Sequence, residues 1–358
     1  MIHSPACEAA KHLWSGKGRF IKNIARVAES IDAGGAGKKK PVPFTFTRVS
    51  VILYCLFAHV RNALGIRSCK GFFRVLGSLR VLYGSMSQSN RLLFNFDEHA
   101  RLMKILSAAR KNGGLSHDPY TDHKYLGEYL ALFMNTANRR KALLFHYSFF
   151  LGKRLNRDFT AKMMNGVIIW KNECRGGGIH ICLEQSDRMV MEGELSLVFF
   201  HDSTRLYTIT FSVCHGNYLG LPHNAVLFIG GVQGQKGRSG EIRRATKLNH
   251  EISPVTMLVI AAQAIGAVLR LNAIVGVTSR WQCSSRHHEY VQNRKSNYDN
   301  LWAVFGGIPH ADKVFVLPIE GKDLPIMGKN RARTRRKRAM KKIIRDNLIR
   351  GLEKEIIR

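Results

Sequence analysis

The sequence predicts an α+β protein in which helices precede a mixed, mostly antiparallel sheet with flanking helices, and a basic helix ends the chain. Three observations support this fold class. Apolar residues at helical spacing fill the first part of the chain, short strand-like runs follow from about residue 160, and a long apolar helical pattern separates two of these runs. With 358 residues, the chain is long enough for one large domain or two smaller ones.

Composition divides the chain into four regions. Glycine, lysine and proline in residues 33–43 indicate a linker. The pattern changes from helical to strand-like near residue 160, and a basic run begins at residue 329. We therefore expect a basic N-terminal extension with its linker (1–44), a helical region (45–160), a mixed-sheet core (161–328) and a basic C-terminal helix (329–358).

Helices are expected ahead of the sheet. The stretch FDEHARLMKILSAARKNGG (96–114) opens with acidic residues, closes with basic ones and ends in two glycines, a pattern typical of a helix. Other helical patterns lie at 17–32, 46–83, 122–134 and 137–153.

Strands are expected in the second half of the chain, with a hairpin turn at Asp202-Ser203. The apolar segment 254–271 begins with a proline, which suits the first turn of a helix. Because this helix separates the strands at 224–233 and 272–279, we expect those two strands to be adjacent and parallel. The remaining strands are predicted at 166–172, 178–185, 193–200, 205–213 and 313–319, with a short helix at 297–307 before the last.

The chain is strongly basic, with a net charge of +31. Residues 329–345 hold ten basic residues and no acidic one, and removing them leaves 46 basic against 25 acidic residues, still +21. The charge therefore belongs to the whole surface as well as to this run, and it favours nucleic acid or anionic lipid head groups as partners. Contacts to an anionic surface are expected at Arg333, Arg335, Arg336, Lys337 and Arg338.

The cysteines and apolar stretches bear on the compartment. Seven scattered cysteines, without any Cys-x-x-Cys, favour a reducing compartment. The N-terminus shows no signal-peptide pattern, and the longest apolar stretch (50–60) is too short to span a bilayer. We expect a cytoplasmic protein, soluble or peripheral at the inner membrane.

Strong catalytic and metal signatures are missing from the sequence. It contains no P-loop, no His-Glu-x-x-His and no Gly-x-Ser-x-Gly. Cys283 with His287 and His288 makes an incomplete zinc set, so no metal site is expected.

The stretch VQGQKGRSGEIRRATK (232–247) is the most distinctive loop. Its glycines allow close approach of the backbone to a ligand, and a helix start can bind phosphate. Gln233, Gly234, Arg243 and Arg244 are the candidate ligand-binding residues, Arg being suited to phosphate oxygens. The alternative is a solvated surface turn.

The order of the elements resembles that of the acetyltransferase-like (GNAT) fold, in which such a turn caps the pyrophosphate of acyl-coenzyme A. The loop departs from that superfamily's Gln/Arg-x-x-Gly-x-Gly/Ala pattern. The resemblance implies acyl-coenzyme A as the cofactor to consider, and Tyr298 as an acid for the leaving thiolate. The alternative for Tyr298 is a buried or capping tyrosine.

Other candidate site residues come from their positions. His146 is either a general base facing a cleft beside the turn or a hydrogen-bonded core histidine. His288 and Tyr290 follow the strand at 272–279 and are candidates for ligand binding.

A second resemblance rests on ordered motifs over about residues 100–345: LLFHYSFF, GELSLVFF, IGGVQG, AIVGVTS, NYDNLWAVFGG, VFVLP and GKNRARTRRKRAMKKI. Together they resemble the VirK/YbjX family of Gram-negative bacteria. The resemblance implies a role in virulence and in resistance to cationic antimicrobial peptides through the cell envelope.

Three functions fit these observations. The first is a VirK-like virulence and cell-envelope factor, for which GNAT-like transfer to an envelope or amine-bearing substrate is one option and a role without catalysis is the other. The second is a non-catalytic RNA-binding protein, which the net charge and the arginine-rich run favour. The third is a peripheral membrane scaffold without an active site.

Overall fold

The structure is a computed structural model that describes residues 96–111, 119–152, 159, 166–174, 177–187, 189–284, 298–320 and 331–356. The chain divides into residues 1–96 and residues 97–358, and nearly all described residues belong to the second unit. The predicted extension, its linker and the helices at 17–32 and 46–83 lie outside the described residues.

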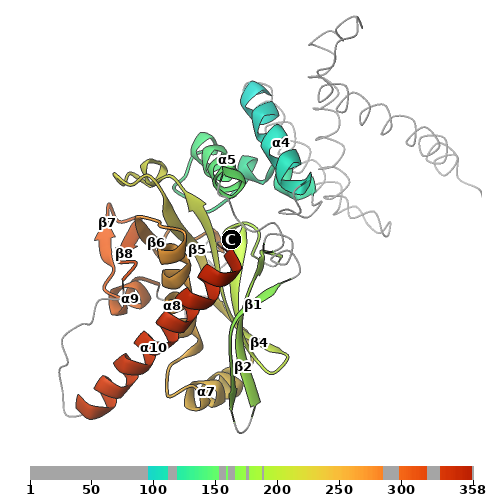
Figure 1. The fold of residues 1–358 in the computed structure, drawn as a ribbon. Helices are drawn as coiled ribbons and strands as arrows, with labels where there is room; N and C mark the ends of the chain where they lie inside the picture. The colour runs from blue at the N-terminus through green and yellow to red at the C-terminus, as the bar shows by residue number, and fades with distance from the viewer. Residues whose placement is uncertain are drawn as a thin grey trace, which may run out of the picture. The chain divides into compact units, whose positions relative to one another are not determined.

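An eight-stranded mixed sheet forms the centre of the described unit (Figure 1). Its order is β1-β2-β3-β4-β5-β6-β8-β7, and every neighbouring pair is antiparallel except β5 and β6. This architecture confirms the predicted α+β class. The strands are β1 (Val167–Cys174), β2 (Gly177–Gln185), β3 (Leu195–His201), β4 (Thr204–Cys214), β5 (Val226–Gly234), β6 (Ala273–Val277), β7 (Ile308–His310) and β8 (Val314–Leu317).

The predicted parallel pair is confirmed. Val226–Ile229 of β5 pairs in parallel with Ala273–Gly276 of β6. Two helices connect these strands, α7 (Ser239–Leu248) and α8 (Pro254–Val268). Ser253 caps α8 by accepting a hydrogen bond from the backbone N–H of Thr256, and Pro254 occupies the first turn. α8 is mostly apolar along its length, which fits its position in the core, where nearly all of its residues are buried.

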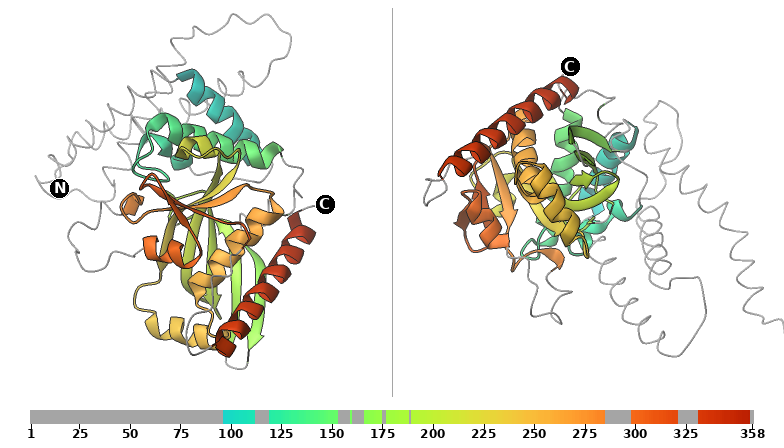
Figure 2. Two further views of the ribbon diagram at one scale, coloured as in Figure 1. Left: turned by 90° about the vertical axis from the view of Figure 1, so that its left-hand side faces the viewer. Right: turned by 90° about the horizontal axis from the view of Figure 1, so that it is seen from below.

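Two helices cover one side of the sheet (Figure 2). α8 packs against β3, β4, β5 and β6, while α10 (Arg331–Ile356) packs against α8 and β1. An apolar stripe along α10 explains this contact, because four of its members are buried: Ile344, Leu348, Leu352 and Ile356. The basic C-terminal helix is therefore part of the folded core.

Helices α4 (Phe96–Lys111) and α5 (Thr136–Gly152) are confirmed, and α5 lies across one end of the sheet (Figure 1). The predicted helix at 122–134 is wrong. Two short 3-10 turns, η1 (Pro119–Asp122) and η2 (Lys124–Leu126), lead into irregular chain instead. The physical reason is that the backbone groups of this segment form hydrogen bonds with residues distant in sequence and not with each other. For example, the Leu130 N–H donates to the Met191 carbonyl at 2.7 Å.

The last part of the sheet adds α9 (Tyr298–Val304) and β7, a three-residue strand that the sequence did not predict. Trp302 of α9 packs on Gly276, where a Cβ would lie 2.3 Å from the indole ring, and its Nε1 donates to the Val277 carbonyl at 2.7 Å. Within the described ranges, no helix combines the length and the apolar character needed to cross a bilayer.

Candidate anion-binding groove

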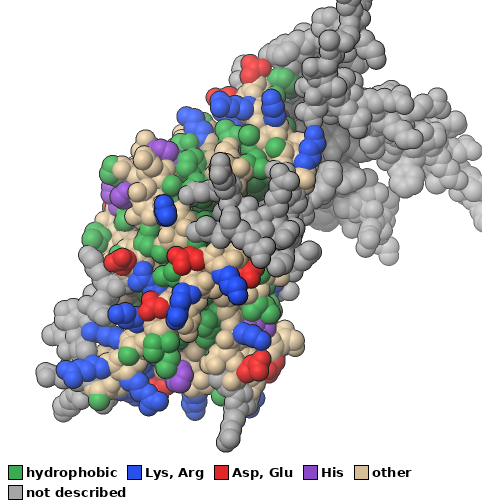
Figure 3. All heavy atoms as spheres, in the orientation of Figure 1, with side chains coloured by type: hydrophobic (Ala, Val, Ile, Leu, Met, Phe, Trp, Pro, Cys, Tyr) green, Lys and Arg blue, Asp and Glu red, His purple; other side chains and the backbone are tan. Residues whose placement is uncertain are grey.

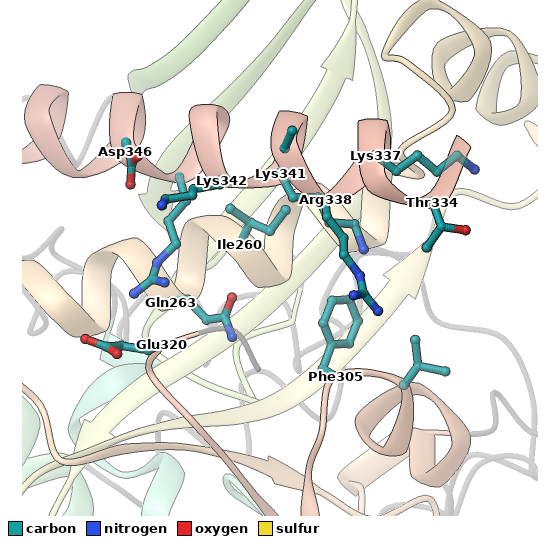
Figure 4. Close-up of a pocket in the computed structure, with 13 residues that line it drawn as sticks. Ile260, Gln263, Phe305, Glu320, Thr334, Lys337, Arg338, Lys341, Lys342 and Asp346 are labelled. Atoms are coloured by element: carbon teal, nitrogen blue, oxygen red, sulfur yellow. The ribbon is translucent and has the colours of Figure 1, made fainter. Parts of the chain in front are cut away.

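A groove of about 630 Å³ lies between α10 and α8 (Figure 4). The residues at the end of α9 and Glu320 close its other side. Its lining includes five basic and two acidic side chains, so the groove is cationic. The basic lining residues are Lys337, Arg338, Lys341, Lys342 and Arg345.

Helical geometry places this charge on one face. Arg338, Lys342 and Arg345 stand at positions i, i+4 and i+7 of α10, which bring side chains to the same side of a helix. The buried Ile344 and Leu348 fix the rotation of α10 about its own axis. The row of cations is thus held over α8 by the apolar stripe of the same helix.

Two of these cations have no protein partner in the part of the chain that the structure describes. Lys342 is exposed and makes no hydrogen bond or ion pair there. The Nε of Arg345 is buried without an acceptor. A buried donor left unpaired costs about 1–3 kcal/mol, so an anionic ligand that reached Arg345 would remove an unfavourable contribution.

The other wall of the groove carries apolar side chains beside the polar Gln263 of α8. Ile260 of α8 is 4% exposed, whereas Val304 at the end of α9 is 67% exposed. Phe305 lines the same groove, and Figure 4 shows the Arg338 side chain extending from α10 toward its ring. The groove therefore combines cations on one helix with apolar side chains opposite them.

The predicted surface-binding residues fall into three groups, one of which is Arg338 in the groove. Arg333 and Lys337 bind Glu251 in the loop before α8, the Arg333 Nε at 2.5 Å and the Lys337 Nζ at 3.3 Å. They attach the first turns of α10 to the core. Arg335 and Arg336 are exposed, and basic side chains gather over this half of α10 in Figure 3.

The predicted phosphate-binding turn is exposed and lies apart from this groove. β5 continues through Gln233 to Gly234, and α7 begins at Ser239. Arg238 pairs with Glu241 at 2.7 Å. Gln233, Arg243 and Arg244 are all exposed, as the alternative of a solvated turn expects. The anion-binding role of this turn stays a prediction.

His146 lies in the core and not beside the turn. Its Nδ1 accepts a hydrogen bond from the Val213 backbone N–H at 3.1 Å. Burial lowers the pKa of His146 to about 4, so the imidazole is neutral at neutral pH. These contacts match the alternative of a hydrogen-bonded core histidine.

Tyr298 is buried at the far end of the same strands. Its hydroxyl accepts from the backbone N–H of Val232 and donates to the Val232 carbonyl, both at 2.7 Å. Leu227, the β5 partner of Val213, lies five positions before Val232, a distance of roughly 16 Å along a strand. His146 and Tyr298 are thus not brought together. His288 and Tyr290 lie outside the described residues.

A buried ionic network is the main feature that the sequence reasoning missed. The Lys124 ammonium pairs with the Glu194 carboxylate, and both side chains are almost fully buried. Tyr129 and Tyr147 donate to the same carboxylate at 2.5 and 2.6 Å. Burial by itself would raise the pKa of Glu194, but Lys124 and these hydrogen bonds hold it below the ordinary value. The available signal was the pair of glutamates in MEGELS, ahead of an apolar strand.

Glu192 is buried, and no cation of the described ranges forms an ion pair with it. It is 5% exposed, and its Oε2 has no hydrogen-bond partner among the described residues. That oxygen lies against Gly231, where a Cβ would come within 1.7 Å of it. Burial raises the pKa of Glu192 to about 7, against the opposing effect of hydrogen bonds to Ser284.

The fold and the groove define an α+β protein with a cationic, partly apolar groove beneath its C-terminal helix. The chain belongs to the DUF535 family, described as a protein of unknown function, whose sequence pattern matches residues 87–349. The VirK/YbjX proteins belong to this family, so that resemblance is confirmed at the family level. No curated protein and no solved structure matches the chain. The acetyltransferase-like relation therefore stays a prediction.

Proposed function

We propose that this DUF535 protein binds the anionic surface of the inner membrane from its cytoplasmic side, with α10 as the contact element. The observation that carries the proposal is the set of basic side chains on α10 beside exposed apolar ones. Ile343 of α10 is 52% exposed, and Val304 and Ile308 are 67% and 62% exposed. The VirK resemblance adds a role in the cell envelope, linked to virulence and to resistance to cationic antimicrobial peptides.

The physical argument combines charge with apolar contact. A basic residue near an anionic leaflet contributes about 1 kcal/mol at low salt. Apolar side chains between the charges can enter the boundary between head groups and acyl chains. Arg335 and Arg336 are exposed on α10 and make no hydrogen bond or ion pair in the described part of the chain, so both are available to a membrane.

Vesicle flotation of the full chain tests the proposal. We expect binding to vesicles with anionic phosphatidylglycerol and little binding to purely zwitterionic vesicles. Arg335→Glu/Arg336→Glu should weaken binding to the anionic vesicles at least 30-fold, since removing two favourable charges alone costs about 2 kcal/mol.

The matched control is Arg243→Glu/Arg244→Glu, which reverses two exposed arginines on α7 and changes the net charge equally. We expect it to keep most of the binding. Equal losses from the two double variants would contradict the assignment to α10. Tighter binding to single-stranded RNA than to vesicles at matched ionic strength would favour the RNA-binding alternative.

A second candidate function is transfer of an acyl group from acyl-coenzyme A to an envelope or amine-bearing acceptor. Its support is topological: β5 pairs with β6 only from Val226 to Ile229, and the glycine-rich turn follows directly on β5. Tyr298 lies at the start of this stretch, where its hydroxyl bonds to the backbone of Val232. His146 bonds to Val213 in the core, so the two predicted catalytic residues do not gather around the turn. Membrane binding is therefore the function that the geometry supports best.

A further inference from the structure

We infer that the groove under α10 holds one anionic lipid molecule, with its phosphate at Lys342 and Arg345 and an acyl chain along the apolar wall. The inference rests on the proposed function and deepens it. A basic surface attracts many head groups, whereas a groove of this kind selects a single molecule.

The phosphate position follows from the two cations that have no protein partner among the described residues. Arg345 offers a buried, unpaired Nε, and Lys342 adds an ammonium three positions before it on the same helix. A guanidinium suits phosphate oxygens because it presents parallel donors. Glu320 and Asp346 line the groove, but neither lies within ion-pair distance of these two cations.

The acyl-chain position follows from the opposite wall. Ile260, Val304 and Phe305 line the groove, and Figure 4 shows Phe305 across the groove from α10. Val304 is the most exposed large apolar residue described, and a chain lying on it would remove that surface from water. The volume of about 630 Å³ falls in the range of binding sites for small molecules.

A lipid fits these features better than a nucleic acid does. Single-stranded nucleic acid is bound by basic tracks with aromatic side chains on which successive bases stack. Phe305 is the single aromatic side chain among the lining residues, and the other apolar side chains opposite α10, Ile260 and Val304, are aliphatic. One phosphate next to an aliphatic surface matches a phospholipid.

Calorimetry of the full chain with dihexanoyl phosphatidic acid, kept below its micelle concentration, tests the inference. We expect saturable binding with one molecule per chain, at least tenfold tighter than inorganic phosphate or dihexanoyl phosphatidylcholine. Lys342→Gln/Arg345→Gln should weaken this binding at least tenfold. Val304→Ser should weaken binding of the lipid and leave that of inorganic phosphate unchanged.

Arg335→Gln/Arg336→Gln is the matched control, because these arginines lie on α10 but do not line the groove. It should keep the affinity for the monomeric lipid while vesicle binding falls. If the groove variant fails to fold by circular dichroism, Lys342→Gln alone replaces it, since Lys342 is exposed. Vesicle binding without saturable binding of the monomer would overturn this inference and leave the proposed function standing. Equal lipid affinity in the groove variant and the wild type would also overturn it.

Discussion

At the scale of single residues, Glu192 makes stability depend on pH. Its pKa is about 7 in the folded chain against an ordinary value of 4.5. Between pH 4.5 and 7 the folded state therefore holds a proton that the unfolded state has lost. The protonated Glu192 contributes fully to the free energy of unfolding below pH 4.5, and this contribution is lost as the pH rises through 7. The loss amounts to about 3 kcal/mol.

Glu192→Gln should remove this dependence, because glutamine does not ionise. In urea unfolding at pH 5, 6, 7 and 8, the variant should gain stability relative to the wild type as the pH rises, and the difference should level off above pH 7. Glu173→Gln, at an exposed position on β1, is the control and should show a constant difference. A constant difference for Glu192→Gln as well would contradict the burial argument.

The pair of Lys124 and Glu194 should behave as a coupled unit. Lys124→Met leaves a buried carboxylate without its cation, which typically costs about 3–5 kcal/mol. We expect a loss of stability of that size in urea unfolding at pH 7. Lys124→Met/Glu194→Gln should recover part of the loss, because the amide is uncharged and can still accept from Tyr129 or Tyr147.

The double-mutant cycle supplies the contradicting outcome. Residues that share one network deviate from additivity by about 0.5–3 kcal/mol. If the losses from Lys124→Met and Glu194→Gln simply add in the double variant, the two groups are not a unit, and the network does not stabilise the junction of η2, α5 and β3.

At the scale of elements, α10 combines a structural apolar face with a basic one. Leu348 is fully buried against the core, so Leu348→Ala should destabilise the protein by about 2–5 kcal/mol in urea unfolding. Asn347→Ala, at the exposed neighbouring position, should change stability by about 0.5 kcal/mol or less. A small effect of Leu348→Ala would mean that α10 is not held by its apolar stripe.

The elements also differ in how well local sequence specifies them. α8 and α10 follow their apolar patterns, and Ser253 with Pro254 marks the start of α8. The segment at 122–134 has a helical pattern, but its backbone bonds to the 189–192 turn and to Trp281. Local propensity is weak relative to such contacts, which explains the wrong prediction.

At the scale of the whole molecule, the basic surface and the core remain separate features. The chain carries a net charge of +31, whereas the buried cations Lys124 and Arg140 of the described residues are each paired with a carboxylate. Charge of this kind concerns partners and solubility and does not specify the fold. The sheet is specified by apolar strands and by the crossover through α8, which forces β6 to lie parallel to β5.

The sequence by itself determined the α+β class, the parallel pair and the basic C-terminal helix, because periodicity and charge runs are local properties. It placed Arg333 to Arg338 in a basic run, but it could not separate Arg333 and Lys337, which bind Glu251, from the groove pair Lys342 and Arg345. Only the tertiary structure separated these two pairs, and only the tertiary structure showed that Glu192 and Glu194 are buried. Burial and partners depend on residues distant in sequence that the fold brings within a few ångströms.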